Sequence, residues 1–223
     1  MKIDSVNIAE ALRYMGNKGT EITENMKSVI EKCEKKLLEA IKPEFTFRCF
    51  DIQITDAGVS IEGTSFILKG NDINNHLSGC QKAVLMCATL GMASDKLIHQ
   101  LSVSDMSESF ITDALASALI EQVCDKAEKE IKKQLPDWFM TWRFSPGYGD
   151  FPIEQQADFL TVTEASKRIG IYLSEGGMMI PSKSVTAVIG LSENEIKQNK
   201  RSCACCNMAD RCDFRKRGEH CGF

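Results

Sequence analysis

The residues with the clearest chemical potential lie in a short turn-forming run from Arg143 to Tyr148, which has the sequence RFSPGY. A Pro-Gly pair favours a turn that can present backbone amides and carbonyls to a ligand. The planar guanidinium of Arg143 can bind a carboxylate through two parallel hydrogen bonds, and the ring face of Tyr148 tolerates a cation. Arg143, Pro146, Gly147 and Tyr148 are therefore candidate ligand-binding residues, although each type alone is more often a surface or packing residue.

A second chemical signal is a cysteine cluster in the last part of the sequence. Four cysteines in the spacing C-x2-C-x5-C-x8-C can surround one zinc ion or one iron–sulfur cluster. They are Cys203, Cys206, Cys212 and Cys221, with Cys205 as an additional thiol. We predict a metal site here, the alternative being a reduced tail that binds no metal. The other five of the ten cysteines stand in apolar or helical stretches and are expected to be small buried hydrophobes.

Composition and charge narrow the classes of function. The formal net charge of -4 argues against nucleic acid as the main partner, because duplex binding needs a basic face. The sequence has no apolar run of about 18 residues, so no membrane span is predicted. Its first residues lack the apolar segment of a secretory signal. We therefore expect a cytoplasmic protein whose cysteines are kept reduced.

Hydrophobic periodicity predicts helices and strands along most of the chain. The longest predicted helix is Ser107–Leu135, where apolar residues recur at three- and four-residue steps. The other predicted helices are Ile8–Tyr14, a helix capped by Thr20 and ended by Pro43, one capped by Asp72 and reaching Leu77, one capped by Ser94 and reaching Leu101, and Ile153–Ile169. The predicted strands are Phe45–Ile54, Val59–Leu68, Lys82–Leu90, Trp138–Phe144 and a strand or hairpin over Met178–Leu191.

The order of these elements predicts the fold class and the domains. Helices and strands do not alternate in regular βαβ units, and no glycine-rich phosphate loop is present, so an α+β fold is expected. Residues 1–199 are expected to form one domain. Residues 200–223 have almost no aliphatic side chains and cannot form a core without a metal or a cross-link, so we expect them to form a separate Cys-rich tail.

Two motifs, in the same order and at similar spacing, resemble the activation domain of cobalamin-dependent methionine synthase. The first is R-x-x-P-G-Y followed by a proline, and the second is M-x-P-x-x-S-V. The matched residues are Arg143, Pro146, Gly147, Tyr148, Pro152, Met179, Pro181, Ser184 and Val185. The stretch DALASALIEQVCD, Asp113–Asp125, is also similar to the long helix of that family. The resemblance covers about residues 111–192.

The resemblance implies a twisted antiparallel sheet with flanking helices and a shallow groove for S-adenosylmethionine, lined by Arg143, Tyr148 and the backbone of the turn. It further implies a cobalamin held by a corrinoid-binding methionine synthase subunit and a low-potential electron donor such as flavodoxin or ferredoxin. The bound S-adenosylmethionine then restores the methylated cofactor. No catalytic residue is assigned, because the cofactor is itself the nucleophile. Asp113 and Glu121 are candidates for binding the ligand ammonium.

Several alternatives remain open at this stage. The sequence contains no D-x-H-x-x-G motif of a corrinoid carrier, so we expect the chain to act on a corrinoid bound by another polypeptide. It is expected to be either the activation subunit of a split methionine synthase or the reactivator of another corrinoid methyltransferase. A third hypothesis is a non-catalytic, metal-binding interaction module. The first two predict binding of S-adenosylmethionine, and the third predicts none. His76, His99 and His220 show no ligand spacing and are expected to be surface or packing residues.

Overall fold

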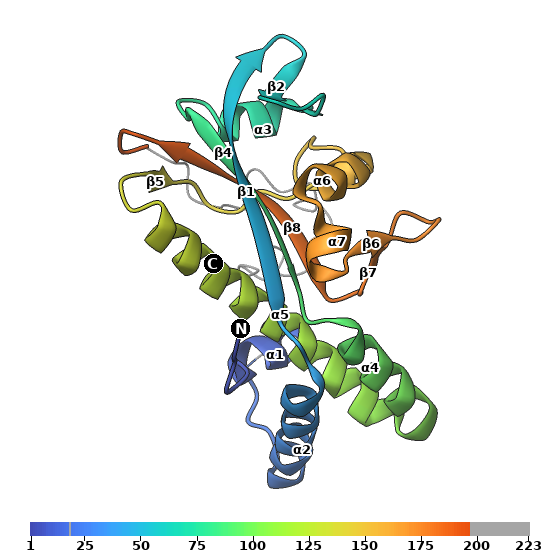
Figure 1. Cartoon of the computed structure of the whole chain (residues 1–223). Helices are drawn as coiled ribbons and strands as arrows, with labels where there is room; N and C mark the ends of the chain where they lie inside the picture. Colours follow the sequence, from blue (N-terminus) through green and yellow to red (C-terminus); the bar gives the residue numbers. More distant parts are fainter. Residues whose placement is uncertain (18, 197–223) are drawn as a thin grey trace. The chain divides into compact units, whose positions relative to one another are not determined.

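The computed structural model describes residues 1–17 and 19–196 of the 223-residue chain. These residues form an α+β fold with one six-stranded sheet in the order β3-β2-β1-β4-β8-β5 (Figure 1). Paired strands run antiparallel, as the registers and the bonds that flank the strands show. The α+β prediction is therefore confirmed. The predicted tail, including Cys203, Cys206, Cys212 and Cys221, lies outside the described residues and stays a prediction.

The chain divides into two compact units, which are described separately. Unit 1 comprises Met1–Thr46, Cys87–Gln134 and Thr163–Val185. Unit 2 comprises Phe47–Met86, Leu135–Val162 and the described residues from Thr186. Three long strands contribute residues to both units, namely β1 (Glu44–Thr55), β4 (Lys82–Thr89) and β8 (Ser184–Ser192).

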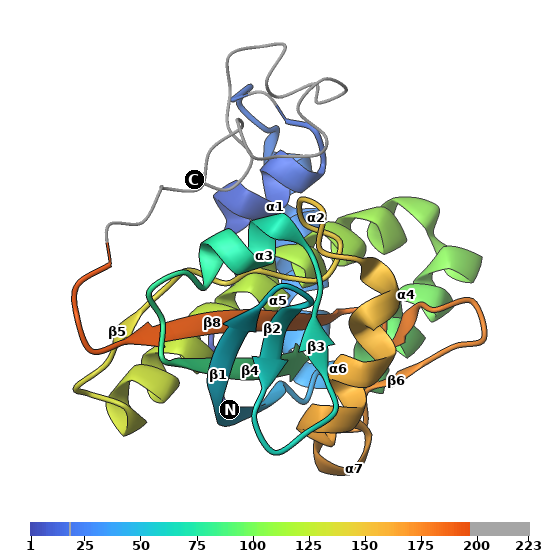
Figure 2. The ribbon, with the colours of Figure 1, turned by 90° about the horizontal axis from the view of Figure 1, so that it is seen from above.

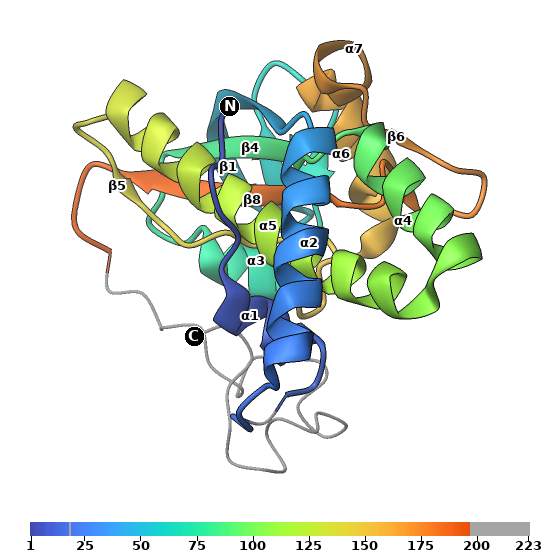
Figure 3. The ribbon, with the colours of Figure 1, turned by 90° about the horizontal axis from the view of Figure 1, so that it is seen from below.

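Unit 1 is built around the long helix α5 (Met106–Gln134), which packs against α1 (Ile8–Tyr14), α2 (Glu24–Ala40) and α4 (Met92–Ser104) (Figure 3). The predicted apolar stripe of α5 is buried from Ala114 to Ile131, whereas Phe110 near the start of the helix is 56% exposed. The carboxylate of Asp105 caps this helix, accepting hydrogen bonds from the backbone N–H groups of Ser107 at 2.9 Å and Glu108 at 3.1 Å.

Two predicted helix caps in unit 1 were wrong. Helix α2 is capped by Thr23, whose hydroxyl accepts from the Met26 N–H at 3.3 Å. Thr20 is instead part of a turn in which its own N–H donates to the side chain of Asn17. Helix α4 is capped by Gly91, while the predicted cap Ser94 is buried in the first turn and donates back to the Gly91 carbonyl. Each helix therefore begins at a different residue from the one predicted.

Unit 2 contains the short strands β2, β3 and β5 and helix α3 (Asn71–His76). Helix α3 lies beside β2 (Gly58–Ile61) in Figure 2. The predicted strand Val59–Leu68 was wrong, because the chain turns between β2 and β3 (Ile67–Leu68). Gly63 has a φ of +75° in this turn, a conformation that glycine adopts without strain. Helix α3 is capped by Gly70 and not by Asp72 as predicted.

The remaining elements differ from their predictions mainly in continuity. The predicted strand Trp138–Phe144 is reduced to β5 (Phe139–Met140) and a single bridge from Phe144. The predicted helix Ile153–Ile169 is divided, because Glu164 has a φ of +55°. Its pieces are η1 (Ile153–Gln155), α6 (Gln156–Thr163) and α7 (Ala165–Ile169). The segment around Pro181 forms the hairpin strand β7 (Met179–Ile180), which pairs with the unpredicted β6 (Tyr172–Leu173), and then β8.

Among the described residues, no helix is both long enough and apolar enough to cross a membrane.

Candidate functional site

Three of the four candidate ligand-binding residues, Pro146, Gly147 and Tyr148, lie in one turn of unit 2, and Arg143 shortly precedes it. Arg143 is 7% exposed and Pro146 is buried, whereas Gly147 is exposed and the Tyr148 side chain is 51% exposed. The turn is closed by hydrogen bonds from the Gly147 N–H to the Phe151 carbonyl (2.8 Å) and from the Phe151 N–H to the Tyr148 carbonyl (3.0 Å). The predicted turn therefore exists, and it presents a bare backbone position beside an accessible phenol ring.

An aromatic cluster supports this turn from within unit 2. Its centre is the buried ring of Phe144, whose centroid lies 5.0 Å from His76, 5.3 Å from Trp142, 6.0 Å from Tyr148 and 6.2 Å from Phe151. Ring centroids at such separations in tilted or stacked arrangements attract one another beyond the apolar area that they bury. The cluster therefore fixes the backbone on both sides of the candidate residues. The expectation that His76 is a packing residue agrees with this position.

A buried hydroxyl joins the same segment to the sheet. Thr141 is 4% exposed, and its Oγ1 accepts a hydrogen bond from the Gly190 N–H at 2.7 Å on β8. The same oxygen lies 2.9 Å from His76 Nε2. Because buried polar groups need partners, this hydroxyl stabilises the segment by accepting from the Gly190 N–H.

The other end of the segment is held by Asp72 and Asp150, neither of which was a candidate ligand-binding residue. The Asp150 carboxylate accepts hydrogen bonds from the backbone N–H groups of Asn71 (2.7 Å) and Asp72 (2.8 Å). In return, the Asp72 carboxylate accepts from the Asp150 N–H at 3.0 Å. We call these three bonds the aspartate clasp. The backbone N–H groups of Asp72 and Asn71 stabilise the anion and hold the pKa of Asp150 below its usual value.

The second motif lies on residues of unit 1. Ser184 donates to the Pro181 carbonyl at 2.7 Å and to Thr89 Oγ1 at 2.9 Å. The neighbouring Lys183 forms an ion pair with Asp113 at 2.8 Å. Asp113, a candidate for the ligand ammonium, is therefore already engaged with a lysine of the second motif.

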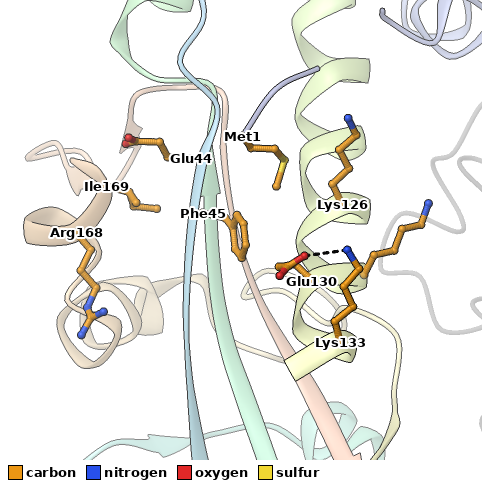
Figure 4. Close-up of a pocket in the computed structure, with 9 residues that line it drawn as sticks. Met1, Glu44, Phe45, Lys126, Glu130, Lys133, Arg168 and Ile169 are labelled. Atoms are coloured by element: carbon orange, nitrogen blue, oxygen red, sulfur yellow. Dashed lines mark hydrogen bonds and ion pairs between the residues drawn. The ribbon is translucent and has the colours of Figure 1, made fainter. Parts of the chain in front are cut away.

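A cavity of about 630 Å³ lies in unit 1 between the end of α5, the start of β1 and α7 (Figure 4). Its lining is partly apolar and partly charged: Met1, Glu44, Phe45, Lys126, Lys129, Glu130, Lys133, Arg168 and Ile169. None of the candidate residues lines it. Lys133 is paired with Glu130 at 3.2 Å, and Arg168 is paired with Glu164 at 2.9 Å. The Lys126 ammonium donates to the Lys2 carbonyl at 2.9 Å. Because no candidate residue lines the cavity and these three cations already have partners, we do not place the functional site there.

Burial raises the pKa of the thiols of Cys33, Cys49, Cys80 and Cys87 above the usual cysteine value. Burial raises the pKa of Cys87 to about 12 and that of Cys80 to about 11. Cys33, Cys87 and Cys124 are buried as expected, but Cys49 is exposed and Cys80 is half-buried, so the prediction was wrong for these two. Within residues 1–17 and 19–196, no group of three or more His, Cys, Asp or Glu side chains is placed to hold a metal ion.

Comparison with known proteins gives a match at the level of structure. No family model and no curated protein matches the sequence. Among solved structures, the crystal structure of the MetH reactivation domain bound to AdoHcy is similar, with a TM-score of 0.65 and 15% sequence identity. The match covers 97% of this chain and 82% of that chain. At so low an identity it is the fold that is shared, and this protein therefore has the fold of the MetH reactivation domain.

Proposed function

We propose that this protein binds S-adenosylmethionine and supports the reductive remethylation of cob(II)alamin, as the activation subunit of a split cobalamin-dependent methionine synthase. The observation that carries the proposal is the shared fold, because the similar MetH domain was crystallised with AdoHcy, the demethylated form of S-adenosylmethionine. The R-x-x-P-G-Y run supports it, since Arg143 to Tyr148 form a turn with an open backbone position and an exposed ring.

Each candidate residue has a role that its chemistry and burial permit. Arg143 binds the ligand carboxylate, and its burial strengthens that contact because the local dielectric is lower than in water. Gly147 has no side chain to cover the turn, so the ligand can approach its peptide groups. The half-exposed ring of Tyr148 offers a face to the sulfonium. Pro146 is buried and holds the turn in place.

The methyl transfer needs no nucleophile from this chain, because the reduced corrinoid of the partner subunit supplies it. The raised pKa values of Cys80 and Cys87 fit this division of roles, since neither sulfur competes as a thiolate for the methyl group. The residues of this chain contribute positioning. The proposed partners are a corrinoid-binding methionine synthase subunit and a low-potential electron donor such as flavodoxin or ferredoxin.

Calorimetric titration with S-adenosylmethionine tests the proposal. We expect Arg143→Ala to weaken binding about 10- to 100-fold, because a charge-assisted hydrogen bond contributes about 1.5–3 kcal/mol. Arg143→Lys keeps the charge in the buried position and loses the two-pronged contact. Tyr148→Ala is expected to weaken binding about 2- to 5-fold, as for an exposed cation–π contact of about 0.5–1 kcal/mol. Tyr172→Ala is the control, since this tyrosine is 45% exposed on β6.

The outcomes separate the remaining hypotheses. Wild-type affinity in both Arg143→Lys and Tyr148→Ala would contradict the assigned site. If the folded wild-type protein does not bind S-adenosylmethionine, with or without a cobalamin-loaded partner, the activation function is refuted. If binding is present, turnover is measured with a methionine synthase that lacks its own activation domain and with another corrinoid methyltransferase. Restoration of the first alone supports the methionine synthase assignment, and restoration of the second alone overturns it.

A further inference from the structure

The aspartate clasp requires glycine at two positions. A Cβ atom at Gly149 would lie 2.0 Å from Asp72 Oδ2, and a Cβ atom at Gly70 would lie 2.7 Å from Asp150 Oδ1. Both glycines have positive φ angles, +55° and +128° respectively. Any side chain at either position would separate the carboxylates from the backbone N–H groups that they bind. The two segments can therefore approach each other this closely only because both positions are glycine.

The clasp is one of two attachments between α3 and the segment from Thr141 to Asp150. At the opposite end of α3, His76 lies 2.9 Å from the Thr141 hydroxyl and packs against the rings of Trp142 and Phe144. The clasp fixes the first residues of α3, and His76 is its last residue. A single short helix therefore holds the segment at both ends, with Arg143 and the Pro-Gly turn between the two attachments.

Asp150 also lies inside the hydrogen-bonded turn itself. The bond from the Gly147 N–H to the Phe151 carbonyl encloses Asp150, and so does the bond from the Phe151 N–H to the Tyr148 carbonyl. A displacement of Asp150 from α3 would move the peptide groups on both sides of it. The position of the exposed Gly147 and Tyr148 thus depends on the clasp.

We infer that Asp150, assisted by Asp72, is a positioning residue that holds the Pro146-Gly147-Tyr148 turn in its ligand-binding conformation before the ligand arrives. The inference rests on the proposed binding of S-adenosylmethionine at this turn. A site that is ordered in advance does not lose binding free energy to ordering the loop. Neither aspartate touches the ligand in this proposal. Both oxygens of the Asp150 carboxylate accept from backbone N–H groups, so an amide cannot replace it, because its NH2 group would face a donor.

The test compares Asp150→Asn with a control variant, Asp105→Ala. The Asp105 carboxylate also accepts from two successive backbone N–H groups at a helix N-terminus, but on α5 in unit 1. Alanine is used there because both bonds go to one oxygen, Oδ1, and an asparagine would keep them. Affinity for S-adenosylmethionine is measured by calorimetry, and exchange of the Asn71 and Asp72 amide hydrogens by NMR. We expect Asp150→Asn to weaken binding about 10- to 100-fold, the range known for outer groups that orient metal ligands. Asp105→Ala should lower the melting temperature and leave the affinity unchanged.

Amide exchange distinguishes positioning from a general loss of stability. In the wild type, the Asn71 and Asp72 amides should be protected without ligand. In Asp150→Asn they should exchange faster, and saturating S-adenosylmethionine should restore much of the protection. The inference is overturned if Asp150→Asn binds as tightly as the wild type, or if Asp105→Ala loses as much affinity. The inference is also overturned if the Asn71 and Asp72 amides of the wild type become protected only when the ligand is bound. This measurement uses the wild-type protein alone and does not depend on the folding of a variant. A wild type that binds no S-adenosylmethionine would instead refute the proposed function, and the inference with it.

Discussion

Replacement of Gly149 by alanine is a direct perturbation of the clasp that leaves both carboxylates in place. The added methyl would lie 2.0 Å from Asp72 Oδ2 and 2.7 Å from its Cγ, well inside contact distance. The Asp72 carboxylate must therefore move by more than 1 Å, as judged from the usual separation of about 3.5 Å between non-bonded heavy atoms. That movement breaks its 3.0 Å hydrogen bond from the Asp150 N–H.

The expected loss of stability has two parts. A left-handed alanine costs about 1–2 kcal/mol relative to glycine, and about 0.4–1 kcal/mol of this is offset because alanine restricts the unfolded chain. Loss of the hydrogen bond, which is partly exposed to solvent, adds about 1 kcal/mol. We therefore expect Gly149→Ala to lower the free energy of unfolding by about 2 kcal/mol. For a chain of this size that corresponds to a fall of about 4–8 °C in melting temperature.

The assay is urea unfolding followed by fluorescence, with Gly170→Ala as the control. Gly170 has a φ of +69° and no atom within 4 Å of an added Cβ, so it reports the cost of the backbone conformation alone. We expect that control to lose about 0.5–1 kcal/mol. The collision argument is refuted if both substitutions lower the free energy of unfolding by the same amount. Gly147→Ala in the same turn, where an added Cβ meets only Ile153 Cδ1 at 3.4 Å, should resemble the control.

Three further predictions follow from other contacts. Thr141→Val keeps the shape of the side chain but leaves the buried Gly190 N–H without its acceptor, so urea unfolding should show a loss of about 1–3 kcal/mol. Side-chain hydrogen bonds from two lysines of α2 lower the pKa of Glu108. The stabilisation by ionised Glu108 is therefore fully present above the pKa of an unfolded glutamate and is lost as the pH falls through the lower folded pKa. The free energy of unfolding of Glu108→Gln should therefore depend less on pH than that of the wild type in this acidic range. For residues 200–223, metal analysis of anaerobically purified protein should find bound zinc or iron, and the metal content should be lower in Cys203→Ser. A metal content equal to background in the wild type would contradict the predicted site.

The elements that sequence analysis predicted correctly are those in which one local signal decides the outcome. Helix α5 has an apolar stripe at helical spacing over its whole length, and β4 is a continuous apolar run that is buried at seven of its eight positions. The errors at Gly63 and Glu164 arise where a residue with a positive φ interrupts an element, and the error at the start of α2 arises where two local partners compete. Thr20 and Thr23 are both acceptable caps, and the outcome depended on Asn17, which binds the backbone of Thr20.

The candidate site also has one feature that could be predicted from the sequence and others that could not. A Pro-Gly pair specifies a turn through its own backbone preferences, so the turn at Pro146 could be predicted from the sequence. The burial of Arg143 could not, because it depends on packing against elements that are distant along the chain. The clasp could not be predicted from the sequence either, since Asp72 and Asp150 are separated by 78 residues and neither belongs to a motif. Only the glycine directly before Asp150 offered a local hint of close approach.

The two glycines that flank Tyr148 have different physical reasons to be glycine, and this difference bears on how the sequence GYGD is interpreted. Gly147 has a φ of +92° and space around it, so its role is to let the backbone turn and remain uncovered. Gly149 has a φ of +55° and no space, so its role is to let Asp150 reach α3. The first glycine therefore belongs to the ligand-binding surface, and the second belongs to its support. A change at Gly147 should alter affinity with a small effect on stability, whereas a change at Gly149 should alter both, because the turn and its anchor are then moved together.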